Sequence, residues 1–134
     1  MKTVVVIDDD LTLLQDISAW LCQEGFQAFT ATQGKQGLKL IQRQRPDLIL
    51  CDVRMPIMDG VETLKALRNQ PLTAEIPFIF LTSEVDIDHF FTVLRLGVTG
   101  FLKKPVNFTE LHQALHRIDF TKAQQAAFME GALS

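Results

Sequence analysis

The side chains best suited to chemistry in this sequence follow directly after short apolar runs. They are carboxylates, a hydroxyl and an amine: Asp8 and Asp9 after Thr3–Ile7, Asp52 after Leu48–Cys51, Thr82 after Ile76–Leu81, and Lys104 after Gly100–Lys103. Carboxylates brought close together repel one another, by about 4 kcal/mol for a close pair at an effective dielectric constant of about 20. A hard cation such as Mg²⁺ would offset this repulsion, because it prefers one or two carboxylates together with water and phosphate oxygens. Lys104 would add a compact positive charge suited to a phosphoryl or carboxylate oxygen.

The apolar runs are typical of buried parallel strands that alternate with helices. Strands are predicted at Thr3–Ile7, Phe26–Thr32, Asp47–Asp52, Ile76–Leu81 and Gly100–Lys103. Apolar residues at helical spacing predict helices over Leu11–Glu24, about 35–44, Gly60–Asn69, a stretch from Ile87 that stops at Gly97, and Phe108–Ile118. Asp10, Asp59 and Asn107 stand where N-caps belong, and Gly25 where a C-terminal cap belongs.

This alternation predicts a doubly wound α/β fold with a five-stranded parallel sheet, five helices and right-handed crossovers. In open sheets of this kind, ligands bind outside the carboxyl ends of the strands, where the strand order reverses. Each polar residue after a strand could by itself be an ordinary turn former or helix cap, and Asp10 fits that description. Because such residues follow four different strands, we expect Asp8, Asp9, Asp52, Thr82 and Lys104 to converge on one crevice.

Length and composition bound the function. With 134 residues, 47% of them hydrophobic and 22% charged, the chain fits one globular domain. The net charge is −3 and the Lys and Arg residues are scattered, which argues against direct nucleic-acid binding. The first apolar run is too short for a signal peptide or a membrane span, so we expect no membrane association and a cytoplasmic location.

Cysteines and histidines carry no recognisable motif. Cys22 and Cys51 lack the spacing of a zinc site or a disulfide framework, and we expect both to be small buried thiols. His89, His112 and His116 fall on predicted helices, and we expect no functional role for them.

The motifs together resemble those of one family. Val6-Ile7-Asp8-Asp9-Asp10, then Asp52 with Met55-Pro56 and Met58-Asp59-Gly60, Leu81-Thr82-Ser83, and Phe101-Leu102-Lys103-Lys104-Pro105 are similar to the receiver domain of two-component response regulators, as in chemotaxis regulators. The resemblance spans about residues 3–118. It implies the flavodoxin-like receiver fold, with strand order 2-1-3-4-5.

The resemblance also implies a role for each matching residue. Asp52 would accept a phosphoryl group from a sensor histidine kinase or a histidine phosphotransfer protein. Asp9, Asp52 and the backbone carbonyl of Arg54 would hold Mg²⁺ directly, with Asp8 acting largely through water. Thr82 and Lys104 would bind the phosphoryl oxygens, and Lys104–Pro105 would be a cis peptide.

A change of state would then reach the surface through Phe101, which turns inward when Thr82 moves toward the new phosphoryl group. Family members often carry an aromatic residue with a hydroxyl where Phe101 stands, and Gly97-Val98-Thr99-Gly100 lacks the frequent acidic residues before the fifth strand. Arg54 and Glu84 are expected to tune how water and donors reach the phosphate. The helices around Phe90 and Phe91 and after Asn107, with the strand between them, would form the surface for a downstream partner or output domain.

We therefore expect residues 1–119 to form a phosphorylation-activated signalling switch that assists its own phosphorylation and dephosphorylation but turns over no external substrate. A degenerate receiver that acts only as a protein-interaction module is the alternative, and a phosphorylation-dependent homodimer stays open. A phosphatase of the haloacid dehalogenase type would need an acid where Arg54 stands, and a dinucleotide enzyme a glycine-rich turn in place of Asp8-Asp9-Asp10. Residues 120–134 would be a C-terminal tail or the start of a linker, with the composition of a short helix.

Overall fold

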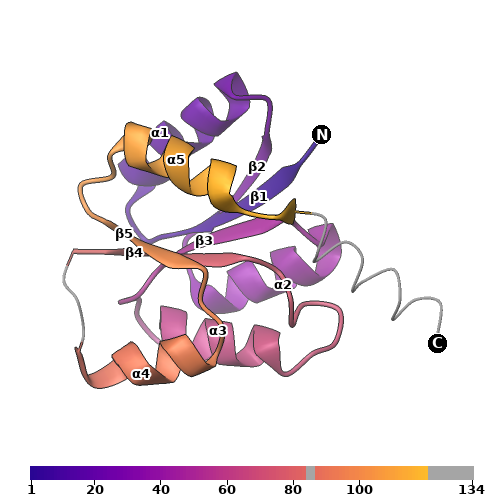
Figure 1. Ribbon diagram of the computed structural model, residues 1–134, viewed down its shortest axis with the longest axis vertical. Coiled ribbons are helices and arrows are strands. Elements are labelled where there is room, and N and C mark those ends of the chain that lie inside the picture. The colour runs from indigo at the N-terminus through magenta and orange to yellow at the C-terminus, as the bar shows by residue number, and fades with distance from the viewer. Residues whose placement is uncertain (84–86, 121–134) are drawn as a thin grey trace.

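The computed structural model describes residues 1–83 and 87–120, and in them strands and helices alternate along the chain (Figure 1). The strands are β1 (Thr3–Ile7), β2 (Gln27–Ala31), β3 (Leu48–Asp52), β4 (Phe78–Thr82) and β5 (Gly100–Lys103). The helices are α1 (Leu11–Gln23), α2 (Gly34–Gln44), α3 (Gly60–Arg68), α4 (Ile87–Arg95) and α5 (Phe108–Arg117). Every predicted element is present.

The strands form one sheet in the order β2-β1-β3-β4-β5, with all neighbours parallel. The expected doubly wound fold with order 2-1-3-4-5 is thereby confirmed. The order reverses between β1 and β3, where Ile7 pairs with Cys51. The residues that follow these two strands, Asp8 and Asp52, consequently lie at the switch point of the sheet.

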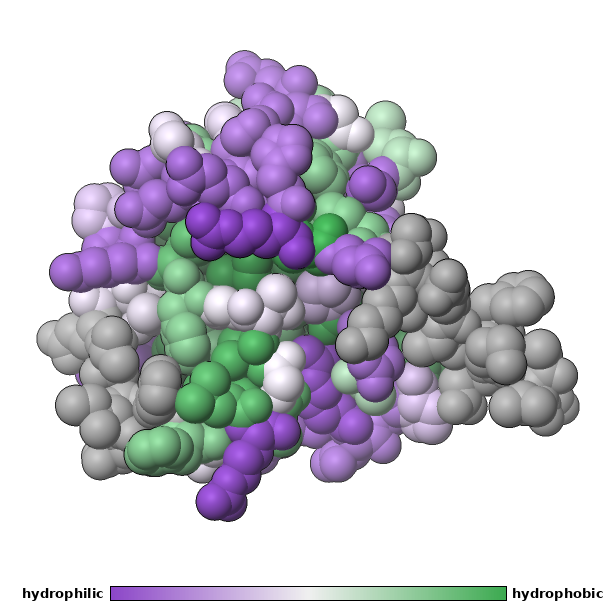
Figure 2. Space-filling model, viewed as in Figure 1, coloured by the Kyte–Doolittle hydropathy of each residue, from purple (hydrophilic) through white to green (hydrophobic). Residues whose placement is uncertain are grey.

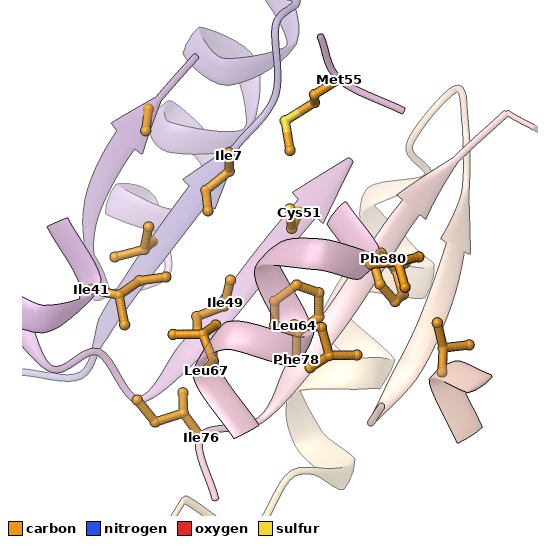
Figure 3. Close-up of a cluster of buried hydrophobic side chains, with 14 residues drawn as sticks. Ile7, Ile41, Ile49, Cys51, Met55, Leu64, Leu67, Ile76, Phe78 and Phe80 are labelled. Atoms are coloured by element: carbon orange, nitrogen blue, oxygen red, sulfur yellow. The ribbon is translucent and has the colours of Figure 1, made fainter. Parts of the chain in front are cut away.

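The helices cover both faces of the sheet, as Figure 1 shows, with α1 and α5 above it and α2, α3 and α4 below. Alternate residues of the central strands point to opposite faces of the sheet and belong to two hydrophobic clusters. One packs Val5, Ile49, Phe78 and Phe80 against α2, α3 and α4, and is drawn in Figure 3. The other packs Val4, Val6, Leu50 and Leu81 against α1 and α5. Strands buried on both faces explain why their sequences are continuous apolar runs.

Side-chain caps fix where the helices begin, and the three predicted N-caps are confirmed. Asp10 accepts a hydrogen bond from the Leu13 N–H at 3.2 Å, and Asn107 accepts from two amides at the start of α5. Asp59 forms a capping box with Glu62 at the start of α3. Gly25, with φ of +87°, ends the first helical segment in a left-handed conformation that favours glycine.

Arg68, at the end of α3, joins three segments that are distant in sequence. Its Nε donates to the Leu96 carbonyl at 2.7 Å, Nη1 to the Ile76 carbonyl at 2.9 Å and Nη2 to the Gly97 carbonyl at 3.1 Å. Burial lowers the pKa of this guanidinium, although the charge of Glu75 acts in the opposite direction. The side chain thus satisfies carbonyls that follow α4 and ties them to α3 and to the residues before β4.

The structure corrects some expectations. Cys22 is exposed, because it lies on the side of α1 turned away from the buried residues Leu14, Ile17 and Leu21, whereas Cys51 is buried as expected. The fourth strand begins at Phe78 and not at Ile76, since Pro77 has no N–H to donate to a neighbouring strand, and it includes Thr82. Of the predicted tail at 120–134, residues 121–134 lie outside the described residues, as does Glu84. None of the described helices has the length and apolar character needed to cross a bilayer.

Candidate functional site

An acidic pocket lies at the carboxyl ends of β1 and β3. Asp8 is fully buried, Asp52 is 7% exposed, and Asp9 beside them is exposed. One carboxylate oxygen from each of the three residues lies within 4.8 Å of the others. The Asp10 N–H donates to Asp8 Oδ1 at 2.9 Å and the Arg54 N–H approaches Asp52 Oδ1 at 3.4 Å, so the loops after both strands orient the carboxylates. The predicted convergence of Asp8, Asp9 and Asp52 is therefore observed.

Lys104 enters the same pocket from the end of β5, across the sheet. Its Nζ lies 2.7 Å from Asp8 Oδ2 and 3.4 Å from Asp52 Oδ2, so a single ammonium bridges the two buried carboxylates. The Lys104 N–H donates to the Thr82 carbonyl at 2.8 Å, and the Lys104–Pro105 peptide is cis, as the resemblance to receiver domains implied. Backbone pairing with β4 holds Lys104 at this end of the sheet.

The charges in the pocket only partly compensate one another. Burial, followed by the charge of Asp8, raises the pKa of Asp52, while Lys104 and the Arg54 N–H act to lower it. Burial alone would lower the pKa of Lys104, but the carboxylates of Asp8 and Asp52 raise it above its usual value. Burial and the nearby aspartates also raise the pKa of the Cys51 thiol, which keeps it protonated and inert. The single Lys104 ammonium thus contacts two carboxylates, and Asp9 adds a third acidic group to the same cluster.

Such a donor set fits a hard divalent cation. Two of the carboxylates are already held by backbone amides, and Asp9 at the mouth of the pocket has access to solvent, as an ion that retains several waters requires. Within the described residues, this is the one group of three or more acidic, His or Cys side chains close enough to share a metal ion. Asp8 differs from the other two, because its Oδ2 already lies against Lys104.

Thr82 and Phe101 lie on the side of the pocket toward β5. Thr82 is the last residue of β4, next to Leu81, which pairs with Asp52, and it is 8% exposed. The Phe101 ring is 40% exposed and stacks on Phe80, with ring centroids 5.8 Å apart. Thr82 therefore lies on the strand next to the one that carries Asp52, and Phe101 lies one strand farther out, on β5.

Two further residues connect Asp52 with Phe101. A Cβ added at Gly60 would come within 2.2 Å of the Asp52 carbonyl oxygen and 2.8 Å of Phe80 Cε1, so the first turn of α3 packs directly on both. Phe80 in turn stacks on Phe101. Gly60 belongs to one of the motifs noted in the sequence. Phe80 belongs to none, because its position in an apolar run is that of an ordinary core residue of a buried strand. The β4–β5 register, in which Phe80 pairs with Phe101, is the observation that identifies it.

Comparison with protein families agrees with this geometry. Residues 4–116 match the model of the response regulator receiver domain, which covers most of the chain. The chain belongs to the response regulator receiver family.

Relatives and solved structures of this receiver domain are numerous. It is 33% identical over 114 residues to the transcriptional regulatory protein ZraR of Escherichia coli K12, a match that covers 85% of this chain and 25% of that protein. It is 30% identical to the probable transcriptional regulator ycf27 of Cyanophora paradoxa, over 87% of this chain and 48% of that protein. The receiver thus spans between a quarter and a half of the length of these curated relatives.

Among solved structures, the Vibrio cholerae chemotaxis protein CheY4 matches with a TM-score of 0.83 and 34% identity, covering 89% of this receiver and 99% of that chain. The receiver domain of the sensor histidine kinase PA1611 from Pseudomonas aeruginosa, described with a magnesium ion coordinated in its active site cleft, matches with a TM-score of 0.78 and 28% identity over 87% of this receiver and 95% of that chain. This receiver is accordingly part of a two-component system.

Proposed function

We propose that this receiver is a phosphorylation-activated switch in which Asp52 accepts a phosphoryl group from a sensor histidine kinase or a histidine phosphotransfer protein. The observation that carries the proposal is the position of the Asp52 carboxylate, almost buried at the switch point of the sheet and 3.4 Å from the Lys104 ammonium. A carboxylate oxygen of Asp52 attacks phosphorus, the bond to the donor's nitrogen or oxygen breaks, and an acyl phosphate results.

The neighbouring groups prepare Asp52 for this reaction. The Arg54 N–H and Lys104 orient its two oxygens, and Lys104 is placed to neutralise a phosphoryl oxygen as charge builds up there. Asp9, Asp52 and the Arg54 carbonyl would hold Mg²⁺, with Asp8 acting through water and through its ion pair with Lys104. Bound in this position, Mg²⁺ would neutralise charge on the phosphoryl oxygens.

Phosphorylation of Asp52 would change the surface through the contacts that connect Asp52 with Gly60, Phe80 and Phe101. Thr82 would donate its hydroxyl to the new phosphoryl group, and Phe101 would turn inward over Phe80. Apolar side chains on the surface formed by α4 and β5 are already exposed: Phe91 by 70%, Leu94 by 49% and Phe101 by 40%. Figure 2 shows hydrophobic residues gathered over this part of the molecule, below a more hydrophilic α5. We assign the partner surface to α4, β5 and α5.

The partners follow from this assignment. The donor would dock at the mouth of the acidic pocket, and a downstream protein or output domain would bind the α4–β5–α5 surface, with a homodimer as one form of output. The domain would assist its own phosphorylation and dephosphorylation in the cytoplasm and turn over no external substrate. Phe120, the first residue of the proposed tail, packs near Phe26, and the Lys2 ammonium lies over its ring.

The test is to incubate the protein with Mg²⁺ and a small phosphodonor and to measure its mass. We expect a gain of one phosphoryl group in the wild type and none in Asp52→Ala. Asp10→Asn is the matched control, because it removes a carboxylate near the pocket while asparagine caps α1 equally well; it should gain the group as the wild type does. A folded wild type that gains nothing from any donor would instead support the interaction module.

A further inference from the structure

Two histidines of α5 face each other on the surface. His112 and His116 are one helical turn apart, both are exposed, and their Nε2 atoms are 3.0 Å apart. At this distance one ring nitrogen must donate a hydrogen atom to the other, because two unprotonated lone pairs would repel. The two imidazole nitrogens therefore lie close enough for one metal ion to contact both once it displaces the shared hydrogen.

Helix α1 orients the first of these rings. Glu24 Oε2 lies 3.8 Å from His112 Nδ1, and Trp20 meets the same ring edge-on, with centroids 6.3 Å apart. The two atoms are too far apart for a direct hydrogen bond, but the negative charge of Glu24 on this side of the ring favours the tautomer with hydrogen on Nδ1, which leaves Nε2 with its lone pair. In carboxylate–histidine–metal arrangements, a shorter contact of the same kind fixes the orientation of the ligating ring.

We propose that His112 and His116 form a two-nitrogen site for a divalent transition metal, separate from the acidic pocket, with Glu24 as a positioning residue. Helices α1 and α5 begin beside the acidic pocket, at the carboxyl ends of the strands, and run away from it. Glu24 and His116, near the C-terminal ends of these helices, therefore lie toward the amino ends of the strands. The site would take a soft or borderline ion and not Mg²⁺, because Mg²⁺ prefers oxygen ligands whereas imidazole suits Zn²⁺, Cu²⁺ and Ni²⁺.

The spacing of the two nitrogens also indicates the coordination geometry. If the nitrogens keep their 3.0 Å separation when a metal binds at about 2.05 Å from each, the angle at the metal would be about 94°. That is close to the right angle of a square-planar or octahedral site, which suits Cu²⁺ and Ni²⁺, and narrower than a tetrahedral angle. Water would fill the other positions. We therefore expect Cu²⁺ and Ni²⁺ to bind more tightly than Zn²⁺.

The experiment uses the 134-residue chain without a histidine tag, in excess Mg²⁺ so that the acidic pocket contributes little. NiCl₂ is titrated and followed by calorimetry, and CuCl₂ by the broadening of backbone amide signals in NMR spectra. We expect one Ni²⁺ per chain and broadening centred on α5. His112→Gln and His116→Gln should each weaken Ni²⁺ binding at least tenfold, whereas His89→Gln, which removes the third histidine, should leave it unchanged.

Glu24→Gln separates a positioning role from a structural one. We expect its Ni²⁺ affinity to fall about threefold to tenfold, less than for a buried ligand partner because Glu24 is partly exposed, while its urea midpoint in chelator stays at the wild-type value. The proposal is overturned if both α5 variants bind Ni²⁺ like the wild type, or if Cu²⁺ broadening centres on the Asp52 loop. Since His116 is exposed, we expect His116→Gln to fold normally. This variant therefore still tests the metal site if His112→Gln fails to fold.

Discussion

Replacing Asp52 with asparagine should stabilise the protein when no divalent metal is bound. At an effective dielectric constant of about 20, charges 4.8 Å apart repel by about 3.5 kcal/mol, and Asp52 has two such neighbours, Asp8 and Asp9. Its attraction to Lys104 at 3.4 Å is about 5 kcal/mol on the same scale. The imbalance of about 2 kcal/mol is reduced by screening at Asp9 and Lys104, which are partly solvated. We expect Asp52→Asn to raise the free energy of unfolding by about 1–2 kcal/mol.

Urea unfolding in chelator, at low salt and neutral pH, measures this difference directly. Added Mg²⁺ should reverse the order, because a ligand at a hundred times its dissociation constant stabilises the native state by about 2.7 kcal/mol, and Asp52→Asn removes one of its ligands. Asp10→Asn serves as the control, since it changes the charge of the chain equally outside the trio. A variant less stable than the wild type in chelator, or one that Mg²⁺ stabilises equally, would refute the electrostatic reasoning.

The dependence on pH has a defined sign. The pKa of Asp52 in the native state is raised above its ordinary value of 3.8, chiefly by burial. Below 3.8 both native and unfolded chains hold the proton, and above it the unfolded chain loses the proton first. The contribution of Asp52 to stability is therefore fully present below that value and is lost as pH rises through the higher native pKa. In chelator, the stability advantage of Asp52→Asn should grow over this interval, and a constant difference would contradict the assigned shift.

Three further substitutions test the other parts of the site. Asp9→Ala should lower Mg²⁺ affinity at least tenfold, measured by titration, while leaving the urea midpoint in chelator unchanged or higher; unchanged Mg²⁺ affinity would contradict its role as a ligand. Lys104→Ala should still accept a phosphoryl group from a small donor, but the NMR shifts that phosphorylation induces on α4 and β5 should disappear; identical shifts would rule out coupling through this amine. Gly60→Ala should cost about 3 kcal/mol or more in urea unfolding, because its Cβ would overlap the Asp52 carbonyl. Gly100→Ala, whose Cβ would meet nothing within 4 Å, should be close to neutral, and equal losses in both would dismiss the packing argument.

The sequence predicted the order of elements and the acidic pocket because both depend on local and repeated signals. Apolar runs mark strands that are buried on both faces, and polar residues directly after them must lie at one edge of a parallel sheet. Asp8, Asp9, Asp52 and Lys104 could therefore be grouped without knowing any distance. The caps of Asp10, Asp59 and Asn107 were equally local.

Features that depend on tertiary packing could not be predicted in this way. Phe80 connects the Asp52 loop to Phe101 only through the register of β4 and β5, which no pattern in either strand specifies. Cys22 is exposed because of the rotation of α1 on the sheet, which a short apolar stripe defines poorly. The sequence predicts no role for the histidines of α5, and the metal site proposed for them rests on ring nitrogens that lie 3.0 Å apart beside Glu24.

The hydrogen bonds of Arg68 limit how α4 can move. Because its guanidinium holds the Leu96 and Gly97 carbonyls, just beyond the end of α4, that end of the helix has a fixed anchor on α3. If phosphorylation moves Thr82, which precedes α4, we expect the start of the helix to move while its end stays in place, so that the helix rotates about the residues held by Arg68. Displacement would be largest near Ile87 and smallest near Arg95. A partner that binds the first turns of α4 would therefore distinguish the phosphorylated from the unphosphorylated state best.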